Sequence, residues 1–153
     1  MSVRRAVPED VYQILNLFYE TIQKVNSKDY TEAQIRVWSE ARDEETWKKK
    51  IQDQYFLVKE VDQIILGFSS IDETGYLDFL YVHAAHQGEG IAAALLREIL
   101  KKAVGQGNHT VWTSSSITAQ PFFRKHGFVE TEKETKSVKG VEFVNSIMKK
   151  TVT

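Results

Sequence analysis

Hydrophobic and polar positions alternate in several distinct ways along the chain, and each pattern predicts an element. Residues 2–7 alternate apolar and polar side chains, which is typical of a short strand. Pro8, Glu9 and Asp10 then favour a helix start, because proline suits the first turn and carboxylates stabilise the positive end of the helix dipole. The apolar stripe of this helix recurs at helical spacing and consists of Val11, Ile14, Leu15, Phe18 and Ile22.

Two more helical segments follow in the first third of the chain. Thr31 and Gln34 have the spacing of a capping box, in which each side chain bonds the backbone N–H of the other residue. They predict the start of a helix that carries Trp38, and a third helical segment surrounds Trp47. The N-terminal region is therefore expected to be mainly helical.

The middle of the chain changes to strands and then back to a helix. Residues 55–58, 64–68 and 76–82 are compact apolar runs with tight connections, and they predict an antiparallel meander. From residue 91 the spacing is again that of a helix, which ends at a glycine-rich turn at residues 105–107. Its buried face is expected to comprise Ala92, Leu95, Leu96, Ile99, Leu100 and Ala103.

The last third of the chain continues this mixture. A strand at 110–113, a short helix at about 117–126 and two strands at about 128–135 and 141–149 are predicted. The chain shows no repeat, linker or low-complexity segment, and a domain typically has roughly 100–200 residues. Residues 1–153 are therefore expected to form one α/β domain with a strand–loop–helix unit at its centre.

Composition narrows the chemistry. The sequence has no cysteine, which excludes disulfides, thiol nucleophiles and cysteine-ligated metals. Its 20 basic and 21 acidic residues leave a net charge of −1, so charge gives no case for nucleic acid or an anionic membrane as a partner. Residues 1–75 carry 10 basic and 14 acidic side chains, whereas residues 76–153 carry 10 and 7. The first part of the chain is thus acidic and the second part basic.

The N-terminus and the hydropathy predict a cytoplasmic protein. Residues 1–8 are charged and lack the apolar core of a signal peptide. No apolar run approaches the roughly 20 residues that a membrane-spanning helix needs.

The loop before the helix at residue 91 carries the most informative chemistry. A hydrophobic strand runs into Gly88 and Gly90 and then into a helix N-terminus, where free N–H groups and the dipole can bind an anion. The loop lacks the Lys-Ser/Thr pair of the nucleotide-hydrolysing phosphate loop and the first glycine of the dinucleotide fingerprint. A plain glycine turn between strand and helix is the alternative interpretation.

Residues 87–92, Gln-Gly-Glu-Gly-Ile-Ala, resemble the Gln/Arg-x-x-Gly-x-Gly/Ala signature of the GNAT superfamily of acyl-CoA-dependent N-acyltransferases. The Leu-x-Val end of the preceding strand, the helix that follows and the segment 119–128 match this superfamily as well. The order of elements agrees over essentially the whole chain, and residues 29–31, 75–78 and 114–123 resemble a bacterial branch of acetyltransferases. The resemblance implies the GNAT fold, an α+β arrangement with a central, mixed but mostly antiparallel sheet of about seven strands flanked by helices.

The resemblance also implies acetyl-CoA as cosubstrate, without a metal, and assigns residues that hold it. The amide N–H of Leu80 would stabilise the oxyanion that develops on the thioester, Val82 would pair through its backbone with the pantetheine arm, and Ser116 would hydrogen-bond that arm. The coenzyme diphosphate would lie on the backbone amides of Gln87, Gly88, Glu89, Gly90, Ile91 and Ala92.

Phe123, which the resemblance also places at the cofactor, departs from the family pattern. Many members have a tyrosine four residues before the Gly-Phe pair, where it can protonate the leaving thiolate, whereas phenylalanine has no proton to give. Either another group donates this proton or the thiolate leaves unprotonated, since its conjugate thiol is a weak acid near neutral pH.

Asp78 is a candidate catalytic and substrate-binding residue. It is a polar residue in an apolar strand, with the same parity as Leu80 and Val82. Functionally, it would accept a proton from the substrate ammonium or hold that ammonium in place. The alternative is a solvent-facing residue on an alternating strand.

Aromatic residues supply the other candidates for substrate binding. Tyr76 is expected on the same face as Asp78, and Tyr30 and Trp38 belong to the helical region where the superfamily builds its acceptor site. Each of them, like Trp47, has packing in the core as its alternative role.

The four histidines are distributed over three places. His83 and His86 flank the glycine loop, where they could contact phosphate or relay a proton, or simply be exposed. His109 begins a strand and His126 ends a helix, and both are expected to be structural. No spacing among the four suggests a metal site.

Transfer of an acetyl group from acetyl-CoA to a primary amine, on a small molecule or a peptide, is the leading hypothesis. Because the chain has no cysteine for an acyl-enzyme, direct attack in a ternary complex is expected, with catalysis from positioning and from the oxyanion amide. The acidic first part of the chain, if it faces the acceptor, favours a cationic amine. Amino acids, polyamines, aminoglycoside-like drugs, peptide termini and protein lysines all stay open, as does a homodimer.

Two other classes of function compete with this enzyme. A non-catalytic acyl-CoA-binding or sensing module stays open because of Phe123. A pure interaction domain without a cofactor is contradicted by the glycine loop.

Overall fold

The computed structural model describes residues 3–153, so Ser2, at the start of the first predicted strand, lies outside the described residues. The strands are β1 (Val3–Arg5), β2 (Tyr55–Val61), β3 (Ile64–Ile71), β4 (Leu77–Val82), β5 (Thr110–Ser115), β6 (Val129–Val138) and β7 (Val141–Thr151). The α-helices are α1 (Val11–Lys24), α2 (Glu32–Ser39), α3 (Glu44–Asp53), α4 (Ile91–Gly105) and α5 (Gln120–Lys125). Three short 3₁₀ turns are η1 (Pro8–Asp10), η2 (Asn26–Asp29) and η3 (Ala84–His86).

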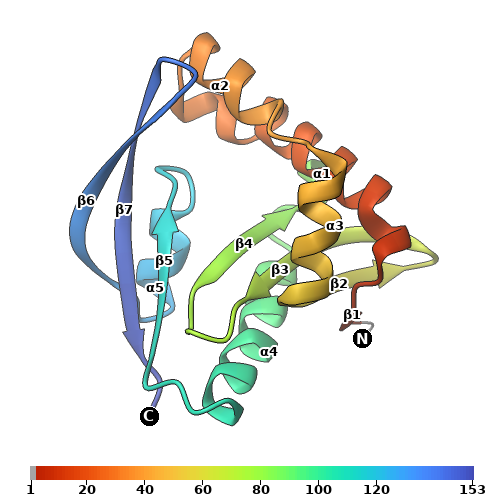
Figure 1. Ribbon diagram of the computed structural model, residues 1–153, viewed down its shortest axis with the longest axis vertical. Coiled ribbons are helices and arrows are strands. Elements are labelled where there is room, and N and C mark those ends of the chain that lie inside the picture. The colour runs from red at the N-terminus through yellow and green to blue at the C-terminus, as the bar shows by residue number, and fades with distance from the viewer. Residues whose placement is uncertain (1–2) are drawn as a thin grey trace.

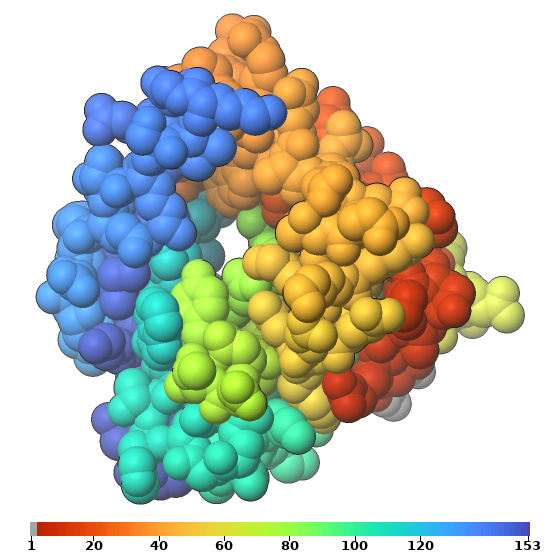
Figure 2. All heavy atoms as spheres, in the orientation of Figure 1, coloured from red at the N-terminus to blue at the C-terminus, as the bar shows by residue number. Residues whose placement is uncertain are grey.

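These strands form two antiparallel sheets, which lie next to each other and diverge (Figure 1). The first has the order β1-β2-β3-β4 and contains the predicted meander, and the second has the order β5-β7-β6. An isolated parallel bridge between Tyr76 and Trp112 joins them at one end. The predicted number of strands and their mostly antiparallel pairing are confirmed. The division between β4 and β5 leaves an opening at the centre of the face in Figure 2.

A β-bulge interrupts β4 near its start. Phe79 lies opposite Ser70 on β3, but the next partner, Ile71, lies opposite Leu77, so Asp78 is the extra residue. A bulge places two consecutive side chains on the same side of the strand and increases the local bend. Residues before and after Asp78 therefore do not keep a simple alternation.

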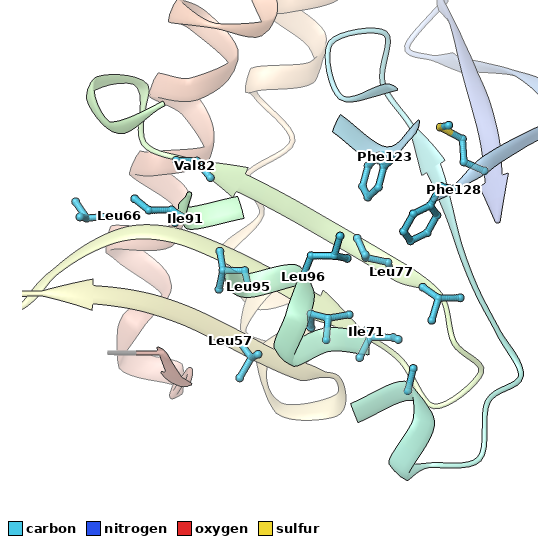
Figure 3. Packing of buried hydrophobic residues seen from close by; sticks show 14 residues of the cluster. Leu57, Leu66, Ile71, Leu77, Val82, Ile91, Leu95, Leu96, Phe123 and Phe128 are labelled. Carbon is cyan, nitrogen blue, oxygen red and sulfur yellow. The ribbon is translucent and has the colours of Figure 1, made fainter. Parts of the chain in front are cut away.

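Helices cover both faces of the first sheet. α1 and α3 cover one face, where Phe18, Trp47, Phe56 and Phe68 are among the buried side chains, and α2 packs on α1. α4 covers the other face, and Figure 3 shows its Ile91, Leu95 and Leu96 side chains against residues of the strands. The predicted apolar stripes of α1 and α4 thus pack in two separate cores on opposite sides of one sheet.

Gly67 on β3 allows α4 to approach the sheet closely. A Cβ at this position would lie 2.8 Å from Ile91 Cγ2 and 3.1 Å from Leu95 Cδ1, which is closer than side chains pack. Both contacted residues belong to the first turns of α4. The absence of a side chain at position 67 therefore determines how near the start of α4 lies to β3.

The second sheet is covered far less. β5 alternates buried and partly exposed residues, whereas nine of the ten residues of β6 are exposed. α5 and Phe128 pack on the inner side, and the far end of β7 meets α2, where Gln34 Nε2 donates to the Glu142 carbonyl (2.8 Å). This contact closes the space between the two sheets at the end opposite the Tyr76–Trp112 bridge.

Local capping signals in the sequence correspond to the observed helix starts. Thr31 and Gln34 form the predicted capping box, with the Thr31 N–H donating to Gln34 Oε1 (2.9 Å) and the Gln34 N–H donating to Thr31 Oγ1 (3.2 Å). The helix predicted from residue 117 begins later, at Gln120. Ser116 Oγ accepts the N–H of Ala119 (3.2 Å), which organises the intervening turn.

Candidate functional site

A cleft of about 420 Å³ lies where β4 and β5 diverge. It corresponds to the opening in Figure 2, which is bordered by segments of α3, β4 and β5. Ten of the residues predicted for the site line this cleft: Tyr30, Trp38, Tyr76, Asp78, Leu80, Val82, Gln87, Ala92, Ser116 and Phe123.

The backbone of β4 presents hydrogen-bonding groups to the cleft. The His83 N–H donates to the Leu66 carbonyl (2.8 Å), which fixes the residues whose amides face β3. Because these amides alternate along an antiparallel strand, the N–H groups of Leu80 and Val82 face away from β3 and toward the cleft. The edge of the first sheet is therefore open where both residues line the cavity.

The carbonyl of Val82 already has two side-chain donors. Thr21 Oγ1 donates to it (3.1 Å), and Gln87 Nε2 donates to it as well (2.7 Å). Backbone pairing with another extended group is therefore left to the Val82 N–H. Through this hydrogen bond, the Gln87 side chain connects the start of the glycine loop to the end of β4.

The start of α4 is an open helix N-terminus. Gly90 has no capping side chain, and the first helical hydrogen bond runs from the Ala94 N–H to the Gly90 carbonyl (3.1 Å), so the amides before Ala94 lack helical acceptors. Gly88 and Gly90 have φ values of +75° and +82°, and a Cβ on either would point into open space. The loop therefore presents bare backbone at the positive end of a helix of 15 residues.

The side chains of this loop make contacts of their own and leave the backbone amides uncovered. Ile91 is buried against β3 although its N–H belongs to the open first turn. Glu89 Oε1 pairs with His86 Nδ1 (3.0 Å), and His83 Nδ1 accepts the Ala85 N–H (3.0 Å), which fixes its ring at the start of η3.

Phe123 contributes an apolar wall. Its side chain is 2% exposed and packs edge-on against Phe128, with ring centroids 5.0 Å apart. Figure 3 shows both rings directed toward Leu77. This position therefore offers the cleft an apolar ring and no hydroxyl.

The expected parity of Asp78 is wrong. The bulge places its side chain with Phe79 on the α3 side of the strand, whereas Leu80 and Val82 pack with the α4 core. Asp78 Oδ2 accepts hydrogen bonds from Lys50 Nζ (2.8 Å) and Gln54 Nε2 (2.9 Å). Asp78 lines the cleft nevertheless, as one member of an ion pair that joins α3 to β4.

Aromatic rings form two walls of the cleft. Tyr30, Trp38 and Phe143 contact one another, with ring centroids 5.0–6.4 Å apart, and we call them the aromatic trio. Opposite the trio in the fold, Tyr76 packs on Trp112 at 4.3 Å. Burial, with the nearby carboxylate of Asp78, raises the pKa of Tyr76 to about 12, so this phenol is neutral at physiological pH.

Trp47 and two of the histidines have structural positions. Trp47 stacks on Phe79 at 4.3 Å in the core, and its indole N–H donates to the Ala41 carbonyl (2.9 Å). His109 bonds Thr153 Oγ1 through Nδ1 (2.7 Å), and His126 packs on the Phe122 ring.

The charge of the cleft does not follow the division along the sequence. Its charged lining residues are Asp78 and Lys136, and none of the acidic side chains in residues 3–75 lines it. Asp78 is paired with Lys50, and Lys136 with Glu134 (3.3 Å). The acidic side chains of residues 3–75 therefore add no charge to the lining of this cleft, and the cationic acceptor stays a prediction.

Several lining residues were missed by reasoning from the sequence. Thr21 lies on α1, Ser114 on β5, and Phe143 and Asn145 on β7. Asn145 Nδ2 donates to Ser114 Oγ (3.1 Å), and Ser114 Oγ donates to Glu134 Oε1 (2.9 Å). The one signal for Asn145 is a polar residue amid the apolar positions of its strand, and that signal is weak.

A divided sheet, a bulged edge strand with open amides and an uncapped helix after a glycine loop together define the fold class of the N-acetyltransferases. The chain belongs to the GNAT family: it matches the acetyltransferase (GNAT) domain over residues 26–152. It is also 30% identical over 149 residues to YafP of Escherichia coli (strain K12), described as an uncharacterized N-acetyltransferase, with 97% of this chain and 95% of that protein covered.

Solved structures give the same fold. A GCN5-related N-acetyltransferase from Rhodopseudomonas palustris has a TM-score of 0.94 at 28% identity, covering 98% of this chain and 94% of its own. The PaiA N-acetyltransferase of Thermoplasma acidophilum, solved in complex with coenzyme A, has a TM-score of 0.78 at 21% identity, with 98% of both chains covered. YncA of Salmonella typhimurium, solved with acetyl-CoA, has a TM-score of 0.70 at 19% identity, covering all of this chain and 94% of its own. Acetyl transfer is thus the general activity of this family.

Helices in residues 3–153 are too short or too polar to cross a bilayer.

Proposed function

We propose that this protein transfers an acetyl group from acetyl-CoA to a primary amine in the cleft between β4 and β5. One observation carries the proposal: the free N–H groups of β4 and the free amides of the glycine loop follow each other on one continuous segment. The Leu80 and Val82 N–H groups face the cleft, and the bare amides of the glycine loop follow within ten residues. An extended donor with a thioester at one end and a diphosphate further along fits both.

Different residues of the segment would bind different parts of acetyl-CoA. The amides of Gly88 through Ala92, at the positive end of α4, suit the diphosphate, and glycine φ values with open space beside them leave room for it. The Val82 N–H suits an amide carbonyl of the pantetheine arm. Ser116 stands at the end of β5, across the cleft, where its hydroxyl can reach the same arm.

The Leu80 N–H would stabilise the negative charge that develops on the thioester oxygen during attack. Removal of one such donor typically lowers the rate by about 100- to 1000-fold. Leu80→Pro deletes this N–H without removing a ladder hydrogen bond, because the group does not face β3. The rest of the catalysis would come from holding the amine close to the acetyl carbon.

The acceptor amine would occupy the end of the cleft lined by Tyr76, Asp78 and Trp38. The Asp78 carboxylate keeps one oxygen, Oδ1, free of the hydrogen bonds to Lys50 and Gln54, and that oxygen can hold the ammonium or take its proton. The amine would attack the thioester directly, since a chain without cysteine has no thiol for an acyl-enzyme.

The test is acetylation of an amine panel that includes amino acids, polyamines, aminoglycosides and peptides, with thiol release measured and products identified by mass spectrometry. We expect N-acetylated product with at least one amine and a rate reduced about 100- to 1000-fold in Leu80→Pro. Thiol release without an acetylated amine would be hydrolysis and would contradict the proposal. Binding of CoA with no turnover on any amine would favour the non-catalytic module instead.

A further inference from the structure

We propose that the Tyr30 hydroxyl donates a proton to the leaving sulfur, the role for which Phe123 has no group. The inference rests on the proposed function, since it concerns the thiol released by acetyl transfer. It is carried by the position of Tyr30 and by the hydrogen bonds of its hydroxyl.

The Tyr30 hydroxyl lies across the cleft from β4, at the end of β5. The Ile117 N–H donates to its oxygen (2.7 Å), and Ser116 lies within hydrogen-bonding reach of the same oxygen. A phenol that accepts a backbone N–H keeps its own proton available for another acceptor. This proton therefore lies beside Ser116, the residue proposed to hold the pantetheine arm.

The ring of Tyr30 is held from several directions. It packs on Trp38 at 5.0 Å and lies 6.4 Å from Phe143 in the aromatic trio. The preceding residue, Asp29, accepts a hydrogen bond from Thr118 Oγ1 at Oδ2 (2.7 Å). The hydrogen bonds that Tyr30 and Asp29 accept from residues 117–118 connect the N-terminal helices to the β5–α5 turn, and they hold the hydroxyl in one position.

Other acidic groups of the cleft are placed less well for this proton. Tyr81 points from β4 into the helical core, where it packs on Phe68 and Phe18 at 5.4 and 5.1 Å. Tyr76 lies four residues before Leu80, about 13 Å along the strand, at the acceptor end. Lys136 belongs to the exposed β6 and pairs with Glu134.

Burial raises the pKa of the Tyr30 hydroxyl above its ordinary value, although the Ile117 N–H acts in the opposite direction. The phenol is therefore protonated at neutral pH, as a proton donor must be.

The transfer balances as follows. The amine nitrogen bonds to the acetyl carbon, the carbon–sulfur bond breaks and its electron pair goes to sulfur. The sulfur takes the Tyr30 proton, and the nitrogen, which carries an extra proton after attack, releases it to water. Tyr30 is then reprotonated from water, and the products are the N-acetylated amine and the free thiol.

The test compares Tyr30→Phe with wild type in two measurements that are independent of each other. One is kcat with an accepted amine, and the other is the pKa of the thiol of bound CoA, followed by the ultraviolet absorbance of the thiolate. A phenol that donates to sulfur stabilises the thiolate, so Tyr30→Phe should raise the bound thiol pKa and lower kcat about 100-fold. Tyr12→Phe, at an exposed tyrosine remote from the cleft, is the matched control and should change neither.

Phe123→Tyr in the Tyr30→Phe background separates proton donation from a structural role. The added tyrosine restores a phenol at the position where many family members have one, without restoring the hydrogen bond to Ile117. We expect the double variant to have a kcat at least tenfold higher than that of Tyr30→Phe alone. An unchanged bound thiol pKa in Tyr30→Phe, or a loss of kcat that Phe123→Tyr does not recover in a folded protein, would overturn the assignment. If wild type transfers to no amine, the proposed function fails, while the thiol pKa still decides whether Tyr30 reaches the sulfur.

Discussion

The two sheets of this protein are both antiparallel but are covered very differently. In the first sheet, seven of the eight residues of β3 are buried, because helices pack on both faces. In the second, nine of the ten residues of β6 are exposed. The cleft lies between a doubly covered sheet and a singly covered one, and both contribute lining residues.

This contrast separates two tasks. The first sheet, with its two cores, supplies the parts whose positions must be fixed: the β4 amides and the start of α4. The second sheet supplies a wall with one apolar face, whose buried Val111 and Met148 belong to the α4 core. Hydrogen bonds attach it as well. At one end, Thr113 Oγ1 donates to the Leu77 carbonyl, and at the other Gln34 donates to the Glu142 carbonyl and Thr118 donates to Asp29. Since local stability follows burial and contact density, we expect the second sheet to open more readily than the first.

The largest effect should come from a cavity in the first sheet. Phe68→Ala removes a fully buried ring that packs on Phe56, Trp47 and Tyr81, and we expect it to lower the free energy of unfolding by about 3–5 kcal/mol. Val144→Ala, at a residue of β7 that is 47% exposed, should change it by no more than about 0.5 kcal/mol. Urea unfolding measures both, and equal losses would contradict the proposed contrast.

Asp78→Asn tests the one charged side chain that the first sheet presents to the cleft. We expect kcat to fall about tenfold or more with CoA binding unchanged, because the amide cannot take a proton from the acceptor. Asp53→Asn, at an exposed residue that ends α3 and pairs with Lys49, is the matched control. Turnover near that of wild type in Asp78→Asn would remove this carboxylate from the mechanism and leave it the role of joining α3 to β4.

Thr118→Val tests one hydrogen bond that attaches the second sheet to the N-terminal helices, and its expected effect on stability is smaller. The change removes the hydroxyl that donates to Asp29, and we expect a loss of about 0.5–1 kcal/mol. Hydrogen exchange should show faster opening of β5 and β7, while the amides of β2 and β3 keep their protection. Uniform acceleration in both sheets would mean that they unfold as one unit.

The smallest effect concerns the pKa of Tyr76 at the junction of the sheets. Burial and the Asp78 carboxylate raise it to about 12, so Asp78→Asn should bring it down toward, but not to, the ordinary value of about 10. Because the folded-state pKa is raised, the contribution of Tyr76 to stability is complete below about pH 10 and is lost as the pH rises toward 12. Phenolate absorbance, with the corresponding Tyr76→Phe variants as blanks, measures the shift, and an unchanged pKa would exclude the carboxylate as a cause.

The sequence predicted the helices and strands well because their signals are local. Apolar spacing indicated α1 and α4, and the Thr31–Gln34 capping box marked the start of α2. The family signature in residues 87–92 located the loop, since its glycines are needed for positive φ and open backbone. Of the predicted site residues, Asp78, Leu80 and Val82 on β4 line the cleft together with Ser116, which directly follows β5.

What could not be predicted depends on pairing between distant residues. The bulge at Asp78 exists only in the register of β4 against β3, so the alternation of β4 alone gave the wrong side for this carboxylate. Phe143 and Asn145 reach the cleft because β7 inserts between β5 and β6, an order that hydropathy does not encode. The Tyr30 contact to Ile117 joins residues 87 positions apart and had no local signal.

Gly67 has a consequence for how the proposed donor would fit the cleft. Its missing side chain brings the first turns of α4 against β3, and this proximity sets the separation between the loop amides and the Leu80 N–H further along β4. In the proposed function, acetyl-CoA must match this separation, because its diphosphate would reach the loop while its acyl carbon would lie at Leu80. A larger residue at position 67 would push the helix outward and lengthen the separation, so the fit of the donor would depend on a residue that never touches it.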